Sequence, residues 1–253
     1  MVITIEMVNR IKDWIKDYFK KNSFFNGVVL GMSGGKDSMI VAKLFADAIG
    51  KEKVFGIIMP NGEMKDKSDA ERICKLLGIK YTIINIQSAY NEILQQTKIA
   101  LNQYNIAEIT NSISNNIPPR LRMTTLYSIA SGLNYLVANT SNLSEASVGY
   151  TTKWGDNVGD ISPIANFTKT EVCEIGLLLG LPKELVLKAP SDGLCGKTDE
   201  DNMKLKYANL DNYIRTGKPN EDIEQILKMH KSSEHKRTGV ISFEPNLNNI
   251  FIK

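Results

Sequence analysis

One short segment of small and polar residues has the composition of a phosphate-binding loop: Gly31-Met32-Ser33-Gly34-Gly35-Lys36-Asp37-Ser38. Backbone N–H groups in such a loop converge on an anion, and the helix that follows adds the positive end of its dipole. The segment fails the P-loop pattern, because Leu30 stands five residues before Gly35 and Asp37 follows Lys36 where Ser or Thr is required. Asp37 would repel phosphate unless a divalent cation lies between them, so we predict Mg²⁺ here.

Hydrophobic periodicity places this loop in a repeating pattern of strands and helices. Apolar residues at three-and-four spacing predict a first helix from residue 8 to 19. Alternating strands and helices predict an α/β fold with a doubly wound parallel sheet and helices on both faces. No repeat or linker is visible, so we expect a single domain over residues 1–253. The expected strands cover 28–32, 54–59, 81–86 and 135–138, and the expected helices between them cover 39–49 and 66–77.

The segments between the third and fourth expected strands, and after the fourth, depart from this simple alternation. Ser88 is suited to cap a helix that runs to about residue 104, and a second helix over 120–134 is expected to follow Pro118 and Pro119. Residues 141–168 contain three glycines and a proline among polar residues, which is more loop chemistry than a connector needs. Long loops of this kind usually carry function.

Composition excludes several classes of function. Of the 253 residues, 31 are Lys or Arg and 28 are Asp or Glu, and a net charge of +3 is too small to predict a nucleic-acid partner. The hydrophobic fraction of 42% is that of an ordinary globular protein, and neither a membrane segment nor a secretion signal is visible. Cys74, Cys173 and Cys195 are widely spaced, which favours the reducing cytoplasm over a disulfide framework. Cys74 is expected to be buried.

The motifs identify a resemblance. The Ser-Gly-Gly-x-Asp-Ser pattern of residues 33–38 resembles the pyrophosphate loop of the N-type ATP pyrophosphatases, which split ATP between its α and β phosphates. Further motifs, in order along nearly the whole chain, resemble ammonia-dependent NAD synthetases. They are Asn116–Met123, Thr140, Glu145–Asp156, Asp160, Lys169, Pro190-Ser191, Thr198-Asp199-Glu200 and His235-Lys236-Arg237.

This resemblance implies a reaction. ATP converts the nicotinate carboxylate of deamido-NAD into an acyl adenylate and pyrophosphate leaves; ammonia then attacks the acyl carbon and releases AMP, which completes the last step of NAD biosynthesis. Free ammonia is the expected nitrogen donor, because 253 residues leave no room for a glutaminase domain. The resemblance also implies a homodimer, with residues 88–134 as its interface.

Roles carry over residue by residue. Asp37 and Glu145 would hold Mg²⁺, and Asp156 is our candidate for accepting a proton when ammonia attacks. Met59 is expected beside the adenine, because ligands of open parallel sheets lie beyond the carboxyl ends of the strands. The residues implied to bind deamido-NAD are Arg120, Lys153, Asp160, His235 and Lys236. Those expected to bind ATP are Gly31, Met32, Ser33, Gly34, Gly35, Lys36, Asp37, Ser38, Met59, Thr140, Lys169 and Ser191.

Several points stay open at this stage. Arg120 and Lys153 could neutralise either the dinucleotide phosphates or the nicotinate carboxylate, and Tyr150 and Trp154 could either stack on the substrate or pack within the loop. Lys36, Asp192 and Lys197 depart from the residues usual in the family. Two rival functions share the loop: tRNA-modifying or sulfur-transferring ATP pyrophosphatases, and a nucleotide sensor without catalysis. The weak net charge and isolated cysteines argue against the first, and the pair of acidic residues argues against the second.

Overall fold

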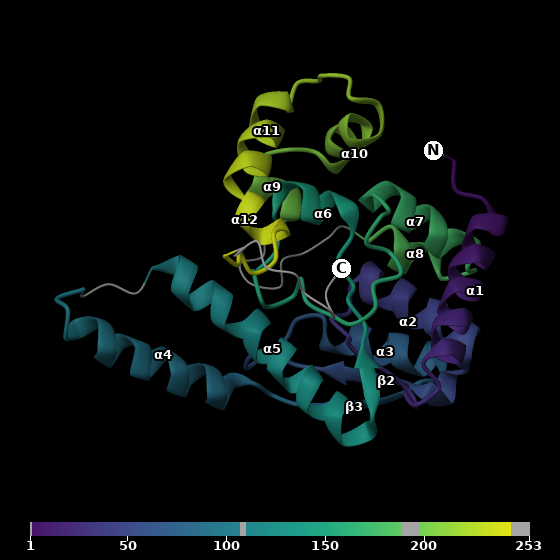
Figure 1. Cartoon of the computed structure of the whole chain (residues 1–253), viewed down its shortest axis with the longest axis horizontal. Coiled ribbons are helices and arrows are strands. Elements are labelled where there is room, and N and C mark those ends of the chain that lie inside the picture. The colour runs from purple at the N-terminus through teal and green to yellow at the C-terminus, as the bar shows by residue number, and fades with distance from the viewer. Residues whose placement is uncertain (1, 107–109, 189–197, 244–253) are drawn as a thin grey trace.

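A single parallel sheet forms the centre of the molecule (Figure 1). The structure, a computed structural model, describes residues 2–106, 110–188 and 198–243. Within these ranges the sheet has four strands in the order β3-β2-β1-β4, and every neighbouring pair is parallel. The strands are β1 (Gly27–Gly31), β2 (Val54–Ile58), β3 (Lys80–Ile83) and β4 (Tyr135–Val137).

The strand order creates a reversal of direction beside β1. The chain moves outward from β1 to β2 and β3, and then returns to place β4 on the other side of β1. The loops after β1 and β4 therefore diverge from neighbouring strands at the same sheet edge, which is where open α/β sheets bind their ligands. A further bridge from Ala138 to Ile161 extends the β4 side.

Helices cover both faces of the sheet, as predicted. On one face α1 (Ile5–Lys21), α2 (Lys36–Ile49), α3 (Lys67–Leu77) and α7 (Lys169–Leu178) enclose the main core, in which Phe45 is fully buried. Cys74 is also fully buried there, which confirms that prediction. On the other face α5 (Asn111–Leu133) packs over a smaller apolar cluster. The α/β fold class is thus confirmed.

A group of short helices stands above the carboxyl ends of the strands (Figure 1). Their apolar centre includes the fully buried Leu210. Asp211 joins this group to the sheet layer: its carboxylate accepts hydrogen bonds from the Ser144 hydroxyl and, at 2.8 Å and 2.7 Å, from the backbone N–H and hydroxyl of Thr170. The group consists of α6 (Leu143–Val148), α9 (Asp199–Met203), α10 (Tyr207–Thr216), α11 (Ile223–Ser232) and α12 (Glu234–Arg237).

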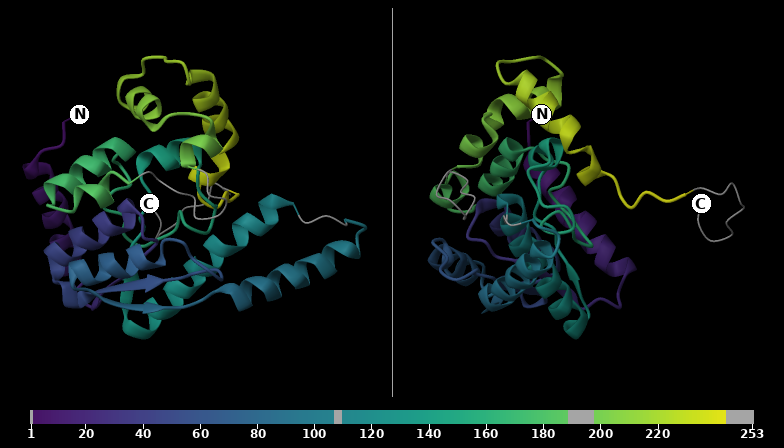
Figure 2. Two further views of the ribbon diagram at one scale, coloured as in Figure 1. Left: turned by 180° about the vertical axis from the view of Figure 1, so that it is seen from behind. Right: turned by 90° about the vertical axis from the view of Figure 1, so that its left-hand side faces the viewer.

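Helix α4 (Gln87–Asn102) and the first part of α5 form an arm that projects from the body, as Figures 1 and 2 show. No residue of α4 is buried. Two short elements complete the described chain, a 3₁₀ turn at Lys51–Lys53 and α8 (Lys183–Val186). None of the helices in the described ranges is both long and apolar enough to cross a bilayer.

Several predicted boundaries are wrong. Helices α1 and α2 each begin three residues before the predicted start, at Ile5 and Lys36, so residues 36–38 of the glycine-rich loop form the first turn of α2. Ile86, not Ser88, precedes α4, and β3 ends at Ile83 because the chain turns into that helix. Helix α5 begins at Asn111, so Pro118 and Pro119 lie inside it although each removes a helical hydrogen bond. Pro119 packs closely on Gly155: a Cβ built on Gly155 would lie 3.0 Å from the Cβ of Pro119. This tertiary packing supports the helix where the prolines remove its hydrogen bonds.

The long segment 141–168 is also less irregular than predicted, because it contains helix α6. A helix of 6 residues gives too little hydrophobic periodicity to be recognised among polar residues. The remainder of the segment is irregular and lies beside the loop after β1.

Candidate active site

The carboxyl ends of the strands open into a cleft of about 400 Å³, within the usual range of small-molecule sites. Every residue of the 31–38 loop lines it, together with Met59, Thr140 and Lys169. Eleven of the twelve residues expected to bind ATP thus surround one space, and the twelfth, Ser191, lies outside the described residues. Glu145 and Asp156 line the same cleft.

The glycine-rich loop has the backbone geometry of an anion site. Gly34 has φ +81°, and a Cβ there would lie 2.6 Å from the Asp66 carbonyl oxygen, so only glycine fits. The Ser33 hydroxyl accepts from the Gly35 N–H at 3.2 Å, and the Ser38 hydroxyl donates to the Gly35 carbonyl at 3.1 Å. Among the described residues no side chain caps α2, so its first-turn N–H groups remain available to phosphate.

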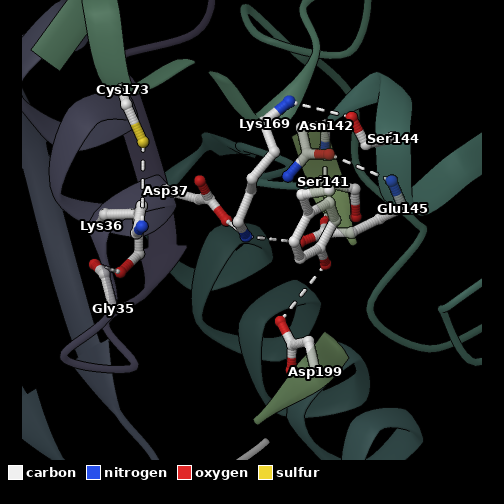
Figure 3. A network of polar contacts seen from close by, with 12 residues as sticks. Gly35, Lys36, Asp37, Ser141, Asn142, Ser144, Glu145, Lys169, Cys173 and Asp199 are labelled. Carbon is white, nitrogen blue, oxygen red and sulfur yellow. Dashed lines mark hydrogen bonds and ion pairs between the residues drawn. The ribbon is translucent and has the colours of Figure 1, made fainter. Parts of the chain in front are cut away.

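Three charged side chains meet at the mouth of this loop (Figure 3). The Lys169 ammonium donates to Asp37 Oδ2 at 2.7 Å and to Glu145 Oε1 at 2.9 Å. The Lys169 side chain is only 7% exposed, and those of Asp37 and Glu145 are 17% and 15% exposed. Asp37, Lys169 and Glu145 are called the charged triad below.

Helix starts place two members of the triad. Asn142 caps α6: its Oδ1 accepts from the Glu145 N–H at 3.1 Å, and Glu145 Oε2 accepts from the Asn142 N–H at 3.3 Å. This capping box commits one oxygen of Glu145 and leaves the other to face Lys169. Lys169 is the first residue of α7, which begins with a second capping box formed by Thr168 and Glu171.

Burial and mutual attraction set the protonation of the triad. Burial raises the pKa of Glu145 to about 7, with Lys169 opposing and Asp37 adding to that rise. Burial alone would lower the pKa of Lys169, but the two carboxylates keep it well above its usual value. Lys169 therefore stays charged, and the Tyr207 ring, 5.3 Å from its ammonium, adds a cation–π contact.

The triad fits a magnesium ion by the chemistry of its oxygens. Asp37 Oδ1 is buried and has no hydrogen-bond partner within the described structure. Buried acceptors of this kind normally have a partner, and a bound cation would provide one. Groups of three or more metal-ligating side chains are absent from the described residues. Mg²⁺ suits two carboxylates, because it keeps several waters and completes its shell with phosphate oxygens.

Asp156 lines the same cleft from the irregular segment before Ile161, whose bridge partner Ala138 follows β4. Its Oδ1 accepts from the Thr152 N–H at 2.6 Å, and the Asn139 amide donates to its carbonyl at 2.9 Å. The carboxylate reaches solvent through the open cleft, but the surrounding protein desolvates it and raises its pKa above the ordinary value. A carboxylate with a raised pKa is a better proton acceptor near neutral pH.

None of the five residues predicted to bind deamido-NAD lines the described cleft. Arg120 donates to the Lys153 carbonyl at 3.3 Å, and the Lys153 ammonium in turn donates to the His235 carbonyl. The Lys236 ammonium donates to the carbonyls of Gly149 at 2.8 Å and Thr151 at 2.7 Å. These contacts tie α5, the loop before Asp156 and α12 together at the rim of the cleft.

Asp160 is likewise engaged by the protein. Its Oδ2 accepts from the Val137 N–H at 2.8 Å and its Oδ1 from the Tyr127 hydroxyl at 3.1 Å. These contacts hold the end of β4, and a ribose hydroxyl would share an acceptor that is already used. Trp154, with φ +61°, is 47% exposed, whereas Tyr150 lines the cleft and its hydroxyl accepts from the Asn202 amide.

Of the three departures from the family pattern, Lys36 is the one that lies within the described residues. The Lys36 ammonium lies 3.8 Å from Cys173 Sγ, so it points toward α7 while its residue still lines the loop (Figure 3). Asp192 and Lys197 lie outside the described residues.

Several residues of the cleft escaped sequence reasoning. Arg122 lines it from α5, and its spacing from Pro119 would have revealed this had the helix been extended through the prolines. The Lys188 ammonium binds Asp66 at 2.7 Å and Asp69 at 2.6 Å beside the glycine-rich loop. No local sequence pattern predicts this pairing, because Lys188 is more than 100 residues from Asp66 and Asp69 in the chain.

The fold and the cleft define an α/β nucleotide-binding protein, and comparison with known proteins narrows the class. The family model of the NAD synthases matches residues 7–240. An NH₃-dependent NAD⁺ synthetase of Carboxydothermus hydrogenoformans is 40% identical over 235 residues, which are 92% of this chain and 94% of that protein.

Solved structures agree. NMN synthetase from Francisella tularensis superposes with a TM-score of 0.85 at 33% identity, covering 97% of this chain and 100% of its own. An NH₃-dependent NAD synthetase from Campylobacter jejuni, solved with a nitrate ion, gives a TM-score of 0.76 at 30% identity, covering 96% and 100%. The chain belongs to the NAD synthase family.

The triad generates the first prediction. Glu145→Gln retains an acceptor for the Asn142 N–H but removes one of the two charges around the cation position. We expect the Mg²⁺ concentration for half-maximal activity to rise roughly 10- to 100-fold, while the thermal unfolding transition stays cooperative. Activity titrations with Mg²⁺ at saturating ATP measure this, and an unchanged half-maximal concentration would remove Glu145 from the metal site.

Proposed function

We propose that this chain is a ligase that amidates deamido-NAD with ammonia at the expense of ATP, giving NAD, AMP and pyrophosphate. The observation that carries the proposal is the meeting of Asp37, Glu145 and Lys169 at the glycine-rich loop, in the same cleft as Asp156. That arrangement supplies anion binding, a cation position and a proton acceptor in one space. Membership of the NAD synthase family supports the same reaction.

The first step is adenylation of the nicotinate carboxylate. A carboxylate oxygen attacks the α-phosphorus of ATP, and the bond between the α-phosphorus and the bridging oxygen breaks as pyrophosphate leaves. The first-turn N–H groups of α2 and the Lys169 ammonium would bind the departing pyrophosphate. Asp37 and Glu145 would hold Mg²⁺, which, when bound, offsets the negative charge that grows on the pyrophosphate.

The second step is attack of ammonia on the acyl carbon. The nitrogen forms a bond to carbon, and the carbon–oxygen bond to AMP breaks as the tetrahedral adduct collapses. One proton must leave the nitrogen, and Asp156 lines the cleft with an acceptor oxygen and a raised pKa. We therefore assign the proton transfer to Asp156.

A second candidate substrate is the mononucleotide that would give NMN as product. The structural match to the Francisella tularensis NMN synthetase has the higher TM-score of the two solved relatives described above, 0.85 against 0.76. The chemistry at the carboxylate is the same in both reactions. The difference lies in whether the rim accommodates the second nucleotide.

The decisive assay offers the purified protein ATP, Mg²⁺, ammonium and either nicotinate dinucleotide or nicotinate mononucleotide, and follows amide, AMP and pyrophosphate together. We expect one AMP and one pyrophosphate for each NAD formed, with kcat/KM higher for the dinucleotide. Higher kcat/KM for the mononucleotide would assign the chain to the second reaction. Release of ADP, or of AMP without amide, would contradict both.

Asp156 generates a prediction about pH. Protonation of its carboxylate removes the acceptor, so the rate, expressed per free ammonia, falls as the pH drops through the raised pKa of Asp156. The fall in rate on the acid side should therefore occur at a higher pH than the pKa of an ordinary aspartate, which is about 4. Asp156→Asn should lower kcat roughly 10²- to 10⁴-fold and remove this fall in rate, whereas adenylate and pyrophosphate still form in a single turnover. A variant that kept the fall in rate would exclude Asp156 as the acceptor.

We further propose that the arm formed by α4 and α5 joins two copies of the chain. Helix α4 buries none of its residues in the described chain, although it carries Ile93 and Ile99, and Tyr104 and Ile106 follow it. All four side chains are exposed. Apolar residues gathered on a projecting arm are typical of an interface, and a second copy supplies the same surface by twofold symmetry.

Light scattering after size exclusion tests the dimer. The wild-type chain should elute at twice its mass, and Ile93→Asp combined with Ile99→Asp should shift it toward the monomer, because charges cannot be buried unpaired at the interface. Leu76→Asp is the matched control, since Leu76 is also exposed but lies on α3, away from the arm. A monomeric wild-type chain, or a shift in the control alone, would contradict the assignment.

A further inference from the structure

Arg122 is a charged residue on an otherwise apolar helix face. Four residues of α5 line the cleft at positions three and four apart: Pro119, Arg122, Met123 and Leu126. That spacing defines one face of the helix. Arg122 is the charged member of this row, and the other three residues give the cleft an apolar wall.

The Nε nitrogen of the guanidinium has a hydrogen-bond partner, and the two Nη nitrogens have none among the described residues. Arg122 Nε donates to the Met59 carbonyl oxygen at 3.1 Å, just after β2 ends. Neither Nη nitrogen forms a hydrogen bond or ion pair with any described residue. Burial lowers the pKa of Arg122, with Asp156 opposing, but a guanidinium remains charged. The two Nη nitrogens are thus unused donors on a residue that lines the cleft.

Most other described cations of the site have internal acceptors. Lys169 binds Asp37 and Glu145, Lys188 binds Asp66 and Asp69, and Lys236 binds two backbone carbonyls. The rim cations Arg120 and Lys153 each donate to a carbonyl, and Lys36 donates to Cys173 Sγ. Lys65 also lines the cleft without a hydrogen bond or ion pair to a described residue, but it is exposed. Arg122 differs in being a half-buried cation whose paired terminal donors are unused.

The position of Arg122 in the cleft indicates which phosphate group of the nucleotide it can bind. A Cβ on Gly31 would touch the Met59 side chain at 3.3 Å and that of Leu126 at 3.9 Å, so Arg122 stands near the start of the glycine-rich loop. The charged triad stands at the other end of that loop, where α2 begins. Asp156 lines the same cleft and attracts Arg122 electrostatically. The anion between the nucleoside and the attacking ammonia is the α-phosphoryl group.

We propose that Arg122 binds the α-phosphoryl group of the nucleotide through its two Nη nitrogens, both in ATP and in the acyl adenylate. A planar fork fits two phosphoryl oxygens at once, which a lysine cannot do. The assignment rests on the proposed function for the acyl adenylate, but AMP itself presents the same group. The same contact would stabilise AMP as the leaving group when ammonia attacks.

The test compares two ligands that differ only in this group, AMP and adenosine, by titration calorimetry on the full chain. We expect Arg122→Gln to weaken AMP roughly ten- to a hundredfold and to leave adenosine unchanged. Arg72→Gln is the matched control, because it removes a guanidinium on α3 that binds Glu184 and does not line the cleft. The ratio of AMP to adenosine affinity should stay constant in the control.

Equal weakening of AMP and adenosine, or an unchanged affinity for AMP, would overturn the assignment. Arg122→Met provides a second variant that suits the apolar face of α5, should the glutamine variant fail to show a cooperative thermal transition, and the same result is expected. The amidation assay stands apart from this measurement. A chain that amidates neither nicotinate nucleotide but loses AMP selectively with Arg122 would refute the proposed function and retain the phosphoryl site.

Discussion

The Lys169 ammonium, held between Asp37 and Glu145, is the interaction on which the site depends. A buried cation is stable only where opposite charges and hydrogen bonds replace its water, and here two carboxylates from separate parts of the chain supply them. Asp37 comes from the start of α2, Glu145 from α6 and Lys169 from α7. The contact therefore fixes the glycine-rich loop against the two helices that follow β4, and it defines the floor of the cleft.

The strand order explains why these parts can meet. Because β4 lies beside β1, the loops that leave both strands rise from adjacent points of the sheet edge. The helix group above the sheet then encloses the cleft from the other side, and Asp211 fastens it through Ser144 and Thr170. Thr170 is the neighbour of Lys169, so the attachment of the helix group also orients the central cation.

Local sequence rules predicted much of this, and tertiary packing decided the rest. The glycine-rich loop and the order of strands and helices follow from patterns within a few residues, whereas helix α6, which carries Glu145, lies in a segment predicted as loop. The helix through Pro118 and Pro119 does not, since its support comes from Gly155 in a distant loop. Arg122 lies within the predicted helix 120–134, but no local pattern showed that it lines the cleft. The rim contacts of Lys153 and Lys236 are made to backbone carbonyls, which no residue pattern reveals.

The two oxygens of Glu145 have different partners, and this has a consequence for the helix that carries them. Glu145 Oε2 is held by the capping box of α6, so the backbone and the carboxylate keep their place if the partner of Oε1 changes. Because the Lys169 side chain is only 7% exposed and bound to both carboxylates, a metal ion at Oε1 would require the ammonium to leave both of them. Such an exchange would change the partner of one carboxylate oxygen without unfolding the start of α6.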